Sequence, residues 1–251
     1  MSEQAAKKAK PNELRETIIV VIEALVIALL FRTFLYQPFS IPTASLQPSL
    51  LIGDYVIASK FAYGYGQWTF PFGAIPIKGR IFGSEPQRGD IAVFRPVPQK
   101  EDFIKRVIGL PGDHIQMING ILNINGEPVQ RELVGRGTDT DSFGNTLPVM
   151  IYKETLPNGV THLINEISDN SQLDNTEEYV VPAGHYFMMG DNRDRSQDSR
   201  VLSAVGYVPE SNLIGKAEAR FFSIKDDIPP WQIWRWPGNV RWDRMFQPVN
   251  N

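Results

Sequence analysis

The segment Thr17–Tyr36, TIIVVIEALVIALLFRTFLY, constrains this chain more than any other part of its sequence. Its mostly apolar residues span about 30 Å as an α-helix, which is the thickness of a bilayer core. Arg32 lies near one end and can reach the interface, whereas Glu23 lies roughly two turns in and costs a few kcal/mol. The segment predicts a transmembrane helix. An amphipathic or core helix is the alternative, and a cleaved signal peptide fits poorly because no small-x-small cleavage pattern follows closely.

Positive charge is concentrated before this segment. Residues 1–16 contain four lysine or arginine residues, whereas none occurs between Arg32 and Lys60. The positive-inside rule therefore predicts a cytoplasmic tail over 1–16, a single span over 17–36, and an exported body beyond Tyr36. No second apolar run of adequate length occurs. This predicts a single-pass membrane protein with its body on the exported side.

The rest of the composition excludes several classes of function. The net charge of −3 lacks the basic excess of a nucleic-acid-binding protein, so no nucleic-acid partner is expected. The absence of cysteine excludes thiol nucleophiles, cysteine-based zinc sites and disulfides. The three histidines, His114, His162 and His185, are too few for a multi-histidine metal site, and a structural or surface role is expected for each.

Beyond Tyr36 the sequence predicts short strands. Asn119-Gly120 separates two apolar runs and predicts a hairpin with a type I′ turn. The polar, turn-rich stretches 135–146 and 168–178 are expected to be loops. The predicted strand regions, which are β-branched or aromatic and are mostly bounded by turn residues, are Asp54–Phe61, Asp90–Val97, Asp102–Gly109, His114–Gly126 and His185–Asp191.

The C-terminal stretch Trp231–Phe246 holds four of the five tryptophans, together with three arginines. Tryptophan and arginine favour the headgroup region of a membrane, so this segment is either a membrane-surface contact or a segment packed over the core.

Three sequence blocks follow one another along the chain: Ile41–Asp54 (IPTASLQPSLLIGD), Arg88–Ile91 with Phe103–Asp113 (RGDI and FIKRVIGLPGD), and Gly190–Arg200 (GDNRDRSQDSR). In this order they resemble the nucleophile, lysine and final boxes of bacterial type I signal peptidases. That family consists of membrane-bound serine endopeptidases that remove signal peptides from exported preproteins. The chain departs from the usual pattern at Leu46, where the family has Met, and at Ser49, where it has Thr.

Lys105 is the candidate general base. Strand alternation places it on one face with Phe103 and Val107, and apolar burial lowers a lysine pKa. Most lysines in strands are solvated, so spacing alone leaves open that Lys105 is a solvated, non-catalytic residue. Arg106 cannot be the base, because a guanidinium does not lose its proton in proteins. The resemblance makes Lys105 the base.

The resemblance also implies roles for the other boxes. Ser45 is the nucleophile, and its N–H together with the Thr43 hydroxyl, where the family often has Ser, forms the oxyanion hole. Ser196 orients the lysine amine. The remaining matched positions, which are expected to be a salt-bridge scaffold, are Asp191, Arg193, Asp198 and Arg200.

The fold implied is mainly β. An N-terminal transmembrane helix precedes an all-β catalytic domain, over 41–114 and 183–220, with a smaller β-domain inserted at 115–182 and a C-terminal segment at 221–251.

The expected partners are the lipid bilayer and preproteins with small residues before the cleavage site, and no metal or cofactor is implied. One alternative is a non-catalytic membrane-anchored β-module. Another is the class of Ser/Lys self-cleaving repressors, which match less well because they are soluble and bind DNA.

Overall fold

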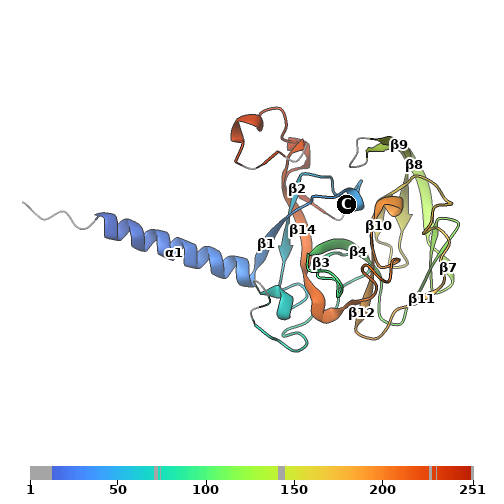
Figure 1. Cartoon of the computed structure of the whole chain (residues 1–251), viewed down its shortest axis with the longest axis horizontal. Coiled ribbons are helices and arrows are strands. Elements are labelled where there is room, and N and C mark those ends of the chain that lie inside the picture. Colours follow the sequence, from blue (N-terminus) through green and yellow to red (C-terminus); the bar gives the residue numbers. More distant parts are fainter. Residues whose placement is uncertain are drawn as a thin grey trace, which may run out of the picture.

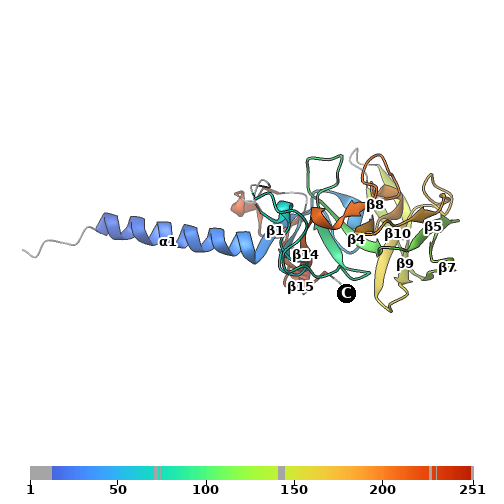
Figure 2. The ribbon, with the colours of Figure 1, turned by 90° about the horizontal axis from the view of Figure 1, so that it is seen from below.

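A computed structural model describes residues 13–70, 73, 75–140, 145–225, 228–229 and 231–249. One long helix, α1 (Glu13–Phe34), extends away from a β-rich body, and the view turned by 90° shows the same arrangement (Figures 1 and 2). The mainly β fold with one N-terminal apolar helix is thereby confirmed. Most of the predicted cytoplasmic tail, residues 1–12, lies outside the described residues.

The stretch Leu14–Phe34 is long and apolar enough to cross a membrane by length and composition, and its apolar window is not buried against the rest of the chain. The helix ends at Phe34 rather than at Tyr36 as predicted. Tyr36 instead begins β1 (Tyr36–Ser40), which pairs with β2. Pro38 explains the early end, because proline cannot continue a helix and disfavours helical backbone at the residue before it.

Among the described residues, an eight-stranded antiparallel sheet forms the larger part of the body. Its order is β1-β2-β14-β3-β4-β12-β13, with β15 paired to β14. It therefore joins strands from the first and last parts of the chain. The strands after β1 are β2 (Asp54–Ser59), β3 (Ile91–Phe94), β4 (Phe103–Gly109), β12 (His185–Met189), β13 (Val208–Pro209), β14 (Leu213–Ser223) and β15 (Gln247–Pro248).

The chain between β4 and β12 forms two smaller sheets, of order β11-β5-β6-β7 and β10-β9-β8. Asn119 and Gly120, between β5 and β6, have φ of 48° and 72°, as a type I′ turn requires, so that hairpin is confirmed. The strands are β5 (His114–Ile118), β6 (Ile121–Ile124), β7 (Glu127–Pro128), β8 (Gln130–Thr140), β9 (Thr146–Thr155), β10 (Thr161–Glu166) and β11 (Tyr179–Val180).

The predicted loop over 135–146 is wrong in its first half, because β8 runs to Thr140. Gly135, Gly137 and Asp139 are poor strand formers, but each pairs with a residue of β9 along a continuous antiparallel ladder. Pairing with a neighbouring strand therefore overrides local propensity here. The predicted loop over 168–178 contains no strand and is confirmed.

The C-terminal segment shows features of both interpretations. The Trp236 ring packs 5.0 Å from that of Phe222, and Arg244 forms an ion pair with the buried Asp54, at 2.6 Å. Three tryptophans nevertheless remain about 70% exposed: Trp231, Trp234 and Trp242. The segment, red in Figures 1 and 2, lies on the side of the body that faces α1.

Candidate active site

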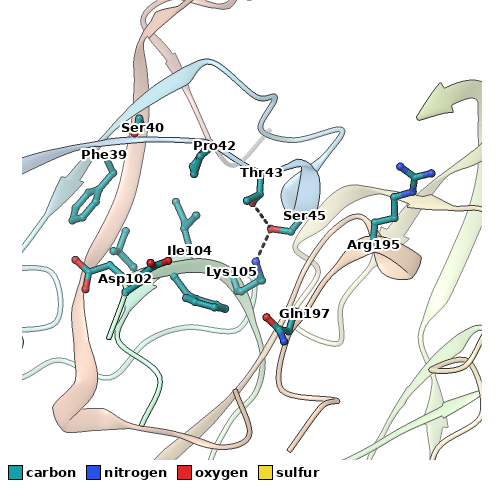
Figure 3. Close-up of a pocket in the computed structure, with 13 residues that line it drawn as sticks. Phe39, Ser40, Pro42, Thr43, Ser45, Asp102, Ile104, Lys105, Arg195 and Gln197 are labelled. Atoms are coloured by element: carbon teal, nitrogen blue, oxygen red, sulfur yellow. Dashed lines mark hydrogen bonds between the residues drawn. The ribbon is translucent and has the colours of Figure 1, made fainter. Parts of the chain in front are cut away.

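Ser45 lies on the short helix η1 (Ala44–Leu46), in the segment that joins β1 to β2. Apolar side chains fix this segment: Ile41, Leu46 and Leu50 are each at most 2% exposed and pack against the large sheet. Ser45 itself is 6% exposed. The apolar residues of this short, turn-rich segment thus hold it against the sheet. The Ser45 hydroxyl therefore has a defined position, which Figure 3 shows.

Lys105, in the middle of β4, points at that hydroxyl. Its Nζ donates a hydrogen bond to Ser45 Oγ at 2.5 Å, and the residue is 4% exposed. The same nitrogen lies 5.6 Å from the centre of the Phe103 ring. Burial lowers the pKa of Lys105 to about 8, against the opposing charges of Asp198 and Asp191. A substantial fraction of this amine is therefore neutral near pH 8 and able to accept a proton.

The Thr43 hydroxyl lies on the other side of Ser45, with its Oγ1 3.4 Å from Ser45 Oγ (Figure 3). Thr43, Ser45 and Lys105 border one cavity of about 460 Å³. The other lining residues are apolar, namely Phe39, Pro42, Val93, Phe103 and Ile104, or polar and charged, namely Ser40, Glu101, Asp102, Arg195 and Gln197. The structure thus brings three of the predicted site residues together at one hollow.

Ser196 is also buried, at 6% exposed, and its hydroxyl makes no direct hydrogen bond with the lysine amine. Lys105 Nζ donates instead to Ser45 Oγ. Ser196 packs instead against Gly190: a Cβ built at Gly190 would lie 2.2 Å from Ser196 Oγ. A role of Ser196 in orienting the lysine amine stays a prediction.

Arg106 and Asp191 form a buried pair behind the dyad. Arg106 Nε and Nη2 donate to the two oxygens of the Asp191 carboxylate, at 2.8 and 2.7 Å, and Nη1 donates to the carbonyl of Gly89. Burial acts to raise the pKa of Asp191, but Arg106 outweighs it and holds the pKa below its usual range. This pair connects β4 to the segment that follows β12.

The other predicted scaffold residues form ion pairs of their own. Arg200 holds Asp198 through two hydrogen bonds of 2.9 Å, and Asp198 also accepts one from the N–H of Gly190. Arg193 reaches into the smaller sheets, where both its Nη atoms donate to Glu154 of β9. These contacts match a structural role, as expected for salt-bridge positions.

Several buried polar contacts around the site are not predicted by the sequence. Asn192 donates from its side chain to Asp139 of β8 at 2.9 Å and to the carbonyl of Ala44 at 3.2 Å. Asp139 falls in a stretch predicted to be a loop. His162 is 3% exposed, and its Nε2 lies 3.2 Å from the Glu154 carboxylate. Each is recognisable only once distant strands are in contact.

The chain is similar to known proteins over most of its length. A family model described as "Signal peptidase, peptidase S26" matches residues 14–222. Signal peptidase I of Rickettsia akari (strain Hartford) is 40% identical over 243 residues, covering 90% of this chain and 89% of that protein. Signal peptidase I of Rickettsia canadensis (strain McKiel) is 41% identical over 246 residues, covering 90% and 89%.

Among solved structures, a crystal structure of a signal peptidase I from Enterococcus faecalis V583 is similar at 27% identity and a TM-score of 0.30, covering 53% of this chain and 97% of that chain. The family model spans most of the chain, and the Rickettsia relatives match over nine-tenths of it. The chain therefore belongs to the signal peptidase, peptidase S26, family of proteases.

Proposed function

We propose that this protease cleaves N-terminal signal peptides from exported preproteins, with Ser45 as the nucleophile and Lys105 as the general base. The observation that carries the proposal is the buried hydrogen bond from Lys105 Nζ to Ser45 Oγ, at 2.5 Å. A serine hydroxyl attacks a peptide carbonyl only when a base removes its proton. Among the described residues that border this cavity, Lys105 is the basic group in hydrogen-bond contact with Ser45.

The reaction proceeds in two halves. Neutral Lys105 takes the Ser45 proton as Oγ bonds to the scissile carbonyl carbon, and the resulting ammonium then gives that proton to the leaving amine as the C–N bond breaks. The signal peptide is left as an ester on Ser45. A water molecule, deprotonated by the neutral lysine, next attacks the ester carbonyl, and the proton returns to Ser45 Oγ as the signal peptide leaves with a free carboxylate.

The negative oxygen that forms in each half needs donors aimed at it. The backbone N–H of Ser45 and the hydroxyl of Thr43 are proposed for this role. Support comes from the position of Thr43 Oγ1, which is 3.4 Å from Ser45 Oγ and borders the same cavity. Both groups lie on the segment that buried apolar residues attach to the large sheet.

Two incompletely paired strand segments border the cavity, which supports binding of the substrate as an added strand. In the described register, β4 pairs with β3 through residues 103–106, whereas β12 pairs with β4 only from Arg106 onward. The backbone of residues 103–105 is therefore open on its second side. β1, which contributes Phe39 and Ser40 to the cavity, is the edge strand of the sheet.

The chemistry of the cavity fits a small residue before the cleaved bond. Bulky side chains, those of Phe39, Phe103 and Ile104, already occupy its walls. A short apolar side chain such as that of alanine buries its methyl group there without displacing them.

The membrane placement is part of the proposal. α1 ends at Phe34, and β1 alone lies between it and the segment that carries Ser45. This short connection keeps the dyad near the membrane surface, where the end of a signal peptide emerges. With the basic residues of 1–16 on the cytoplasmic side, the dyad is on the outer face.

The test is cleavage by the purified full-length chain in detergent. A preprotein is incubated with wild type and with Ser45→Ala, and the N-terminus of the product is sequenced. We expect one new N-terminus directly after the signal peptide with wild type and none with Ser45→Ala. As a control, a cooperative thermal unfolding transition shows that the purified chain is folded. Intact preprotein in both samples from such a chain would instead support a non-catalytic membrane-anchored module.

A further inference from the structure

Three carboxylates meet at the end of β10, among residues that the proposed mechanism does not use. Glu166, Asp174 and Asp194 each bring one carboxylate oxygen to within 4.8 Å of the others. They come from three segments: Glu166 ends β10, Asp174 lies in the loop before β11, and Asp194 lies on η4 (Arg193–Arg195). Like charges held this close repel each other unless a cation or proton lies between them.

The carboxylates have unused oxygens that are buried. Glu166 is 1% exposed, and neither of its carboxylate oxygens has a hydrogen-bond partner among the described residues. Asp174 is also 1% exposed; its Oδ2 accepts the N–H of Ser171, but its Oδ1 has no such partner. Buried carboxylate oxygens are normally paired or bound to a metal, because leaving them without either is costly.

The nearby arginines do not supply the missing partner. Arg193 directs both its Nη atoms to Glu154, and Arg131 forms its ion pair with Asp169, at 2.9 Å. The third carboxylate, Asp194, accepts two backbone N–H groups at its Oδ2, from Ile167 and Ser168. Among the described residues, the three carboxylates therefore receive no direct hydrogen bond from a cationic side chain.

We propose that Glu166, Asp174 and Asp194 together bind a calcium ion. Carboxylate oxygens are the ligands that hard divalent cations prefer, and oxygens on opposite sides of one Ca²⁺ lie about 4.6–5.2 Å apart. A spread of at most 4.8 Å therefore matches a single ion. Ca²⁺ also accepts irregular geometry from separate segments, whereas Mg²⁺ demands a near-ideal octahedron at shorter distances. Asp194 is only partly buried, which leaves a side open for entry of the ion.

The ion would connect the end of β10 to the segment behind Ser45. Asn165, the residue before Glu166, forms a parallel bridge with Asn192, and its N–H donates to the carbonyl of Asp191 at 2.9 Å. The N–H of Asn192 in turn donates to the carbonyl of Ser45 at 3.1 Å. Binding at this site therefore stabilises the contact between the smaller sheets and the segment that bears the nucleophile, without contact with the reacting atoms.

The experiment is thermal unfolding of the full-length chain in detergent, followed by tryptophan fluorescence. The chain is stripped with EGTA and then titrated with CaCl₂ or MgCl₂ up to 10 mM. We expect CaCl₂ to raise Tm by roughly 5–10 °C at a hundredfold excess over its dissociation constant, and MgCl₂ to act only at higher concentration. Isothermal titration calorimetry of the wild-type chain with CaCl₂ should show binding heat for one site.

Three variants separate this site from calcium binding elsewhere. Glu166→Gln and Asp174→Asn should each remove the calcium shift, and Glu166→Gln should raise Tm in EGTA because it relieves repulsion. Asp169→Asn, in the same loop but 49% exposed at its side chain, is the matched control and should keep the shift. No calcium shift and no binding heat for wild type would overturn the proposal and indicate a shared proton. A full shift in both ligand variants would also overturn it.

Discussion

The backbone N–H of Asn192 donates a hydrogen bond to the carbonyl oxygen of Ser45, at 3.1 Å. The segment after β12 therefore lies directly behind the candidate nucleophile. Gly190 makes this approach possible: a Cβ there would lie 2.4 Å from the Ser45 carbonyl oxygen and 2.2 Å from Ser196 Oγ. Real Cβ atoms do not come that close, so the position requires glycine for reasons of space rather than of backbone conformation.

Gly190→Ala should therefore lower kcat for signal-peptide cleavage at least about tenfold, because the added methyl group pushes the Ser45 segment away from Lys105. Gly135→Ala is the matched control, since its Cβ would make only ordinary contacts of 3.9–4.0 Å with Ile151. Steady-state kinetics on one peptide substrate measures both. Activity of Gly190→Ala within twofold of wild type would show that the approach of these two segments does not matter for catalysis.

Replacement of either member of the dyad should abolish cleavage. Ser45→Ala removes the nucleophile and Lys105→Ala removes the base, while Tm is expected to stay near the wild-type value. Lys105→Arg should be equally inactive, since a guanidinium does not lose its proton in proteins. Single-turnover cleavage at high enzyme concentration is the measurement. More than a tenth of wild-type activity in Lys105→Ala would rule out Lys105 as the base.

Thr43→Val keeps the shape of the side chain and removes its donor, so kcat should fall about 10²–10³-fold, as for loss of one oxyanion donor elsewhere. Thr43→Ser keeps the hydroxyl and is expected to retain most of the activity. The comparison separates the donor from the packing of the methyl group. An unchanged kcat in Thr43→Val would place stabilisation of the oxyanion on other groups.

The pH dependence of kcat/KM should report the pKa of Lys105. Below that pKa the amine is an ammonium ion and cannot accept the Ser45 proton, so activity rises with pH through about 8. Gln197→Glu adds a carboxylate to the cavity wall, which favours the ammonium form of Lys105. The acidic limb of the kcat/KM profile should therefore move to higher pH. Profiles from pH 6 to 10 for wild type, Gln197→Glu and the uncharged control Gln197→Asn test this. A limb near 6.5, unmoved in Gln197→Glu, would indicate a histidine base instead.

The buried pair of Arg106 and Asp191 should be a large stability determinant. Arg106→Met leaves the Asp191 carboxylate without its cation and should lower the free energy of unfolding by about 3–5 kcal/mol. In the double variant Arg106→Met/Asp191→Leu both charges are absent, and much of this loss should be recovered. Urea unfolding of the three chains gives the values. Equal loss in the single and double variants would mean that packing, rather than the unpaired charge, sets the cost.

Much of the fold was predictable because it depends on local pattern. The apolar run that forms α1, the alternating runs of β2, β3 and β4, and the Asn119-Gly120 turn each follow from neighbouring residues alone. The errors arose where distant pairing decides. The sequence pattern predicts Tyr36 in the helix, but this residue pairs with Ser59. The pattern predicts Gly135 in a loop, but this residue pairs with Ile151.

The sequence by itself determined the apolar helix, the mainly β body and three ordered motifs, in which Ser45 and Lys105 stand sixty positions apart. Only the tertiary structure decided that Lys105 Nζ reaches Ser45 Oγ and that Asn192 meets Asp139 of β8. The physical reason is that helix and turn preferences act between near neighbours, whereas a buried polar contact needs strands from distant parts of the chain to exclude water together. Side chains such as those of Glu166 and Asp174 therefore show no local sign of their proximity.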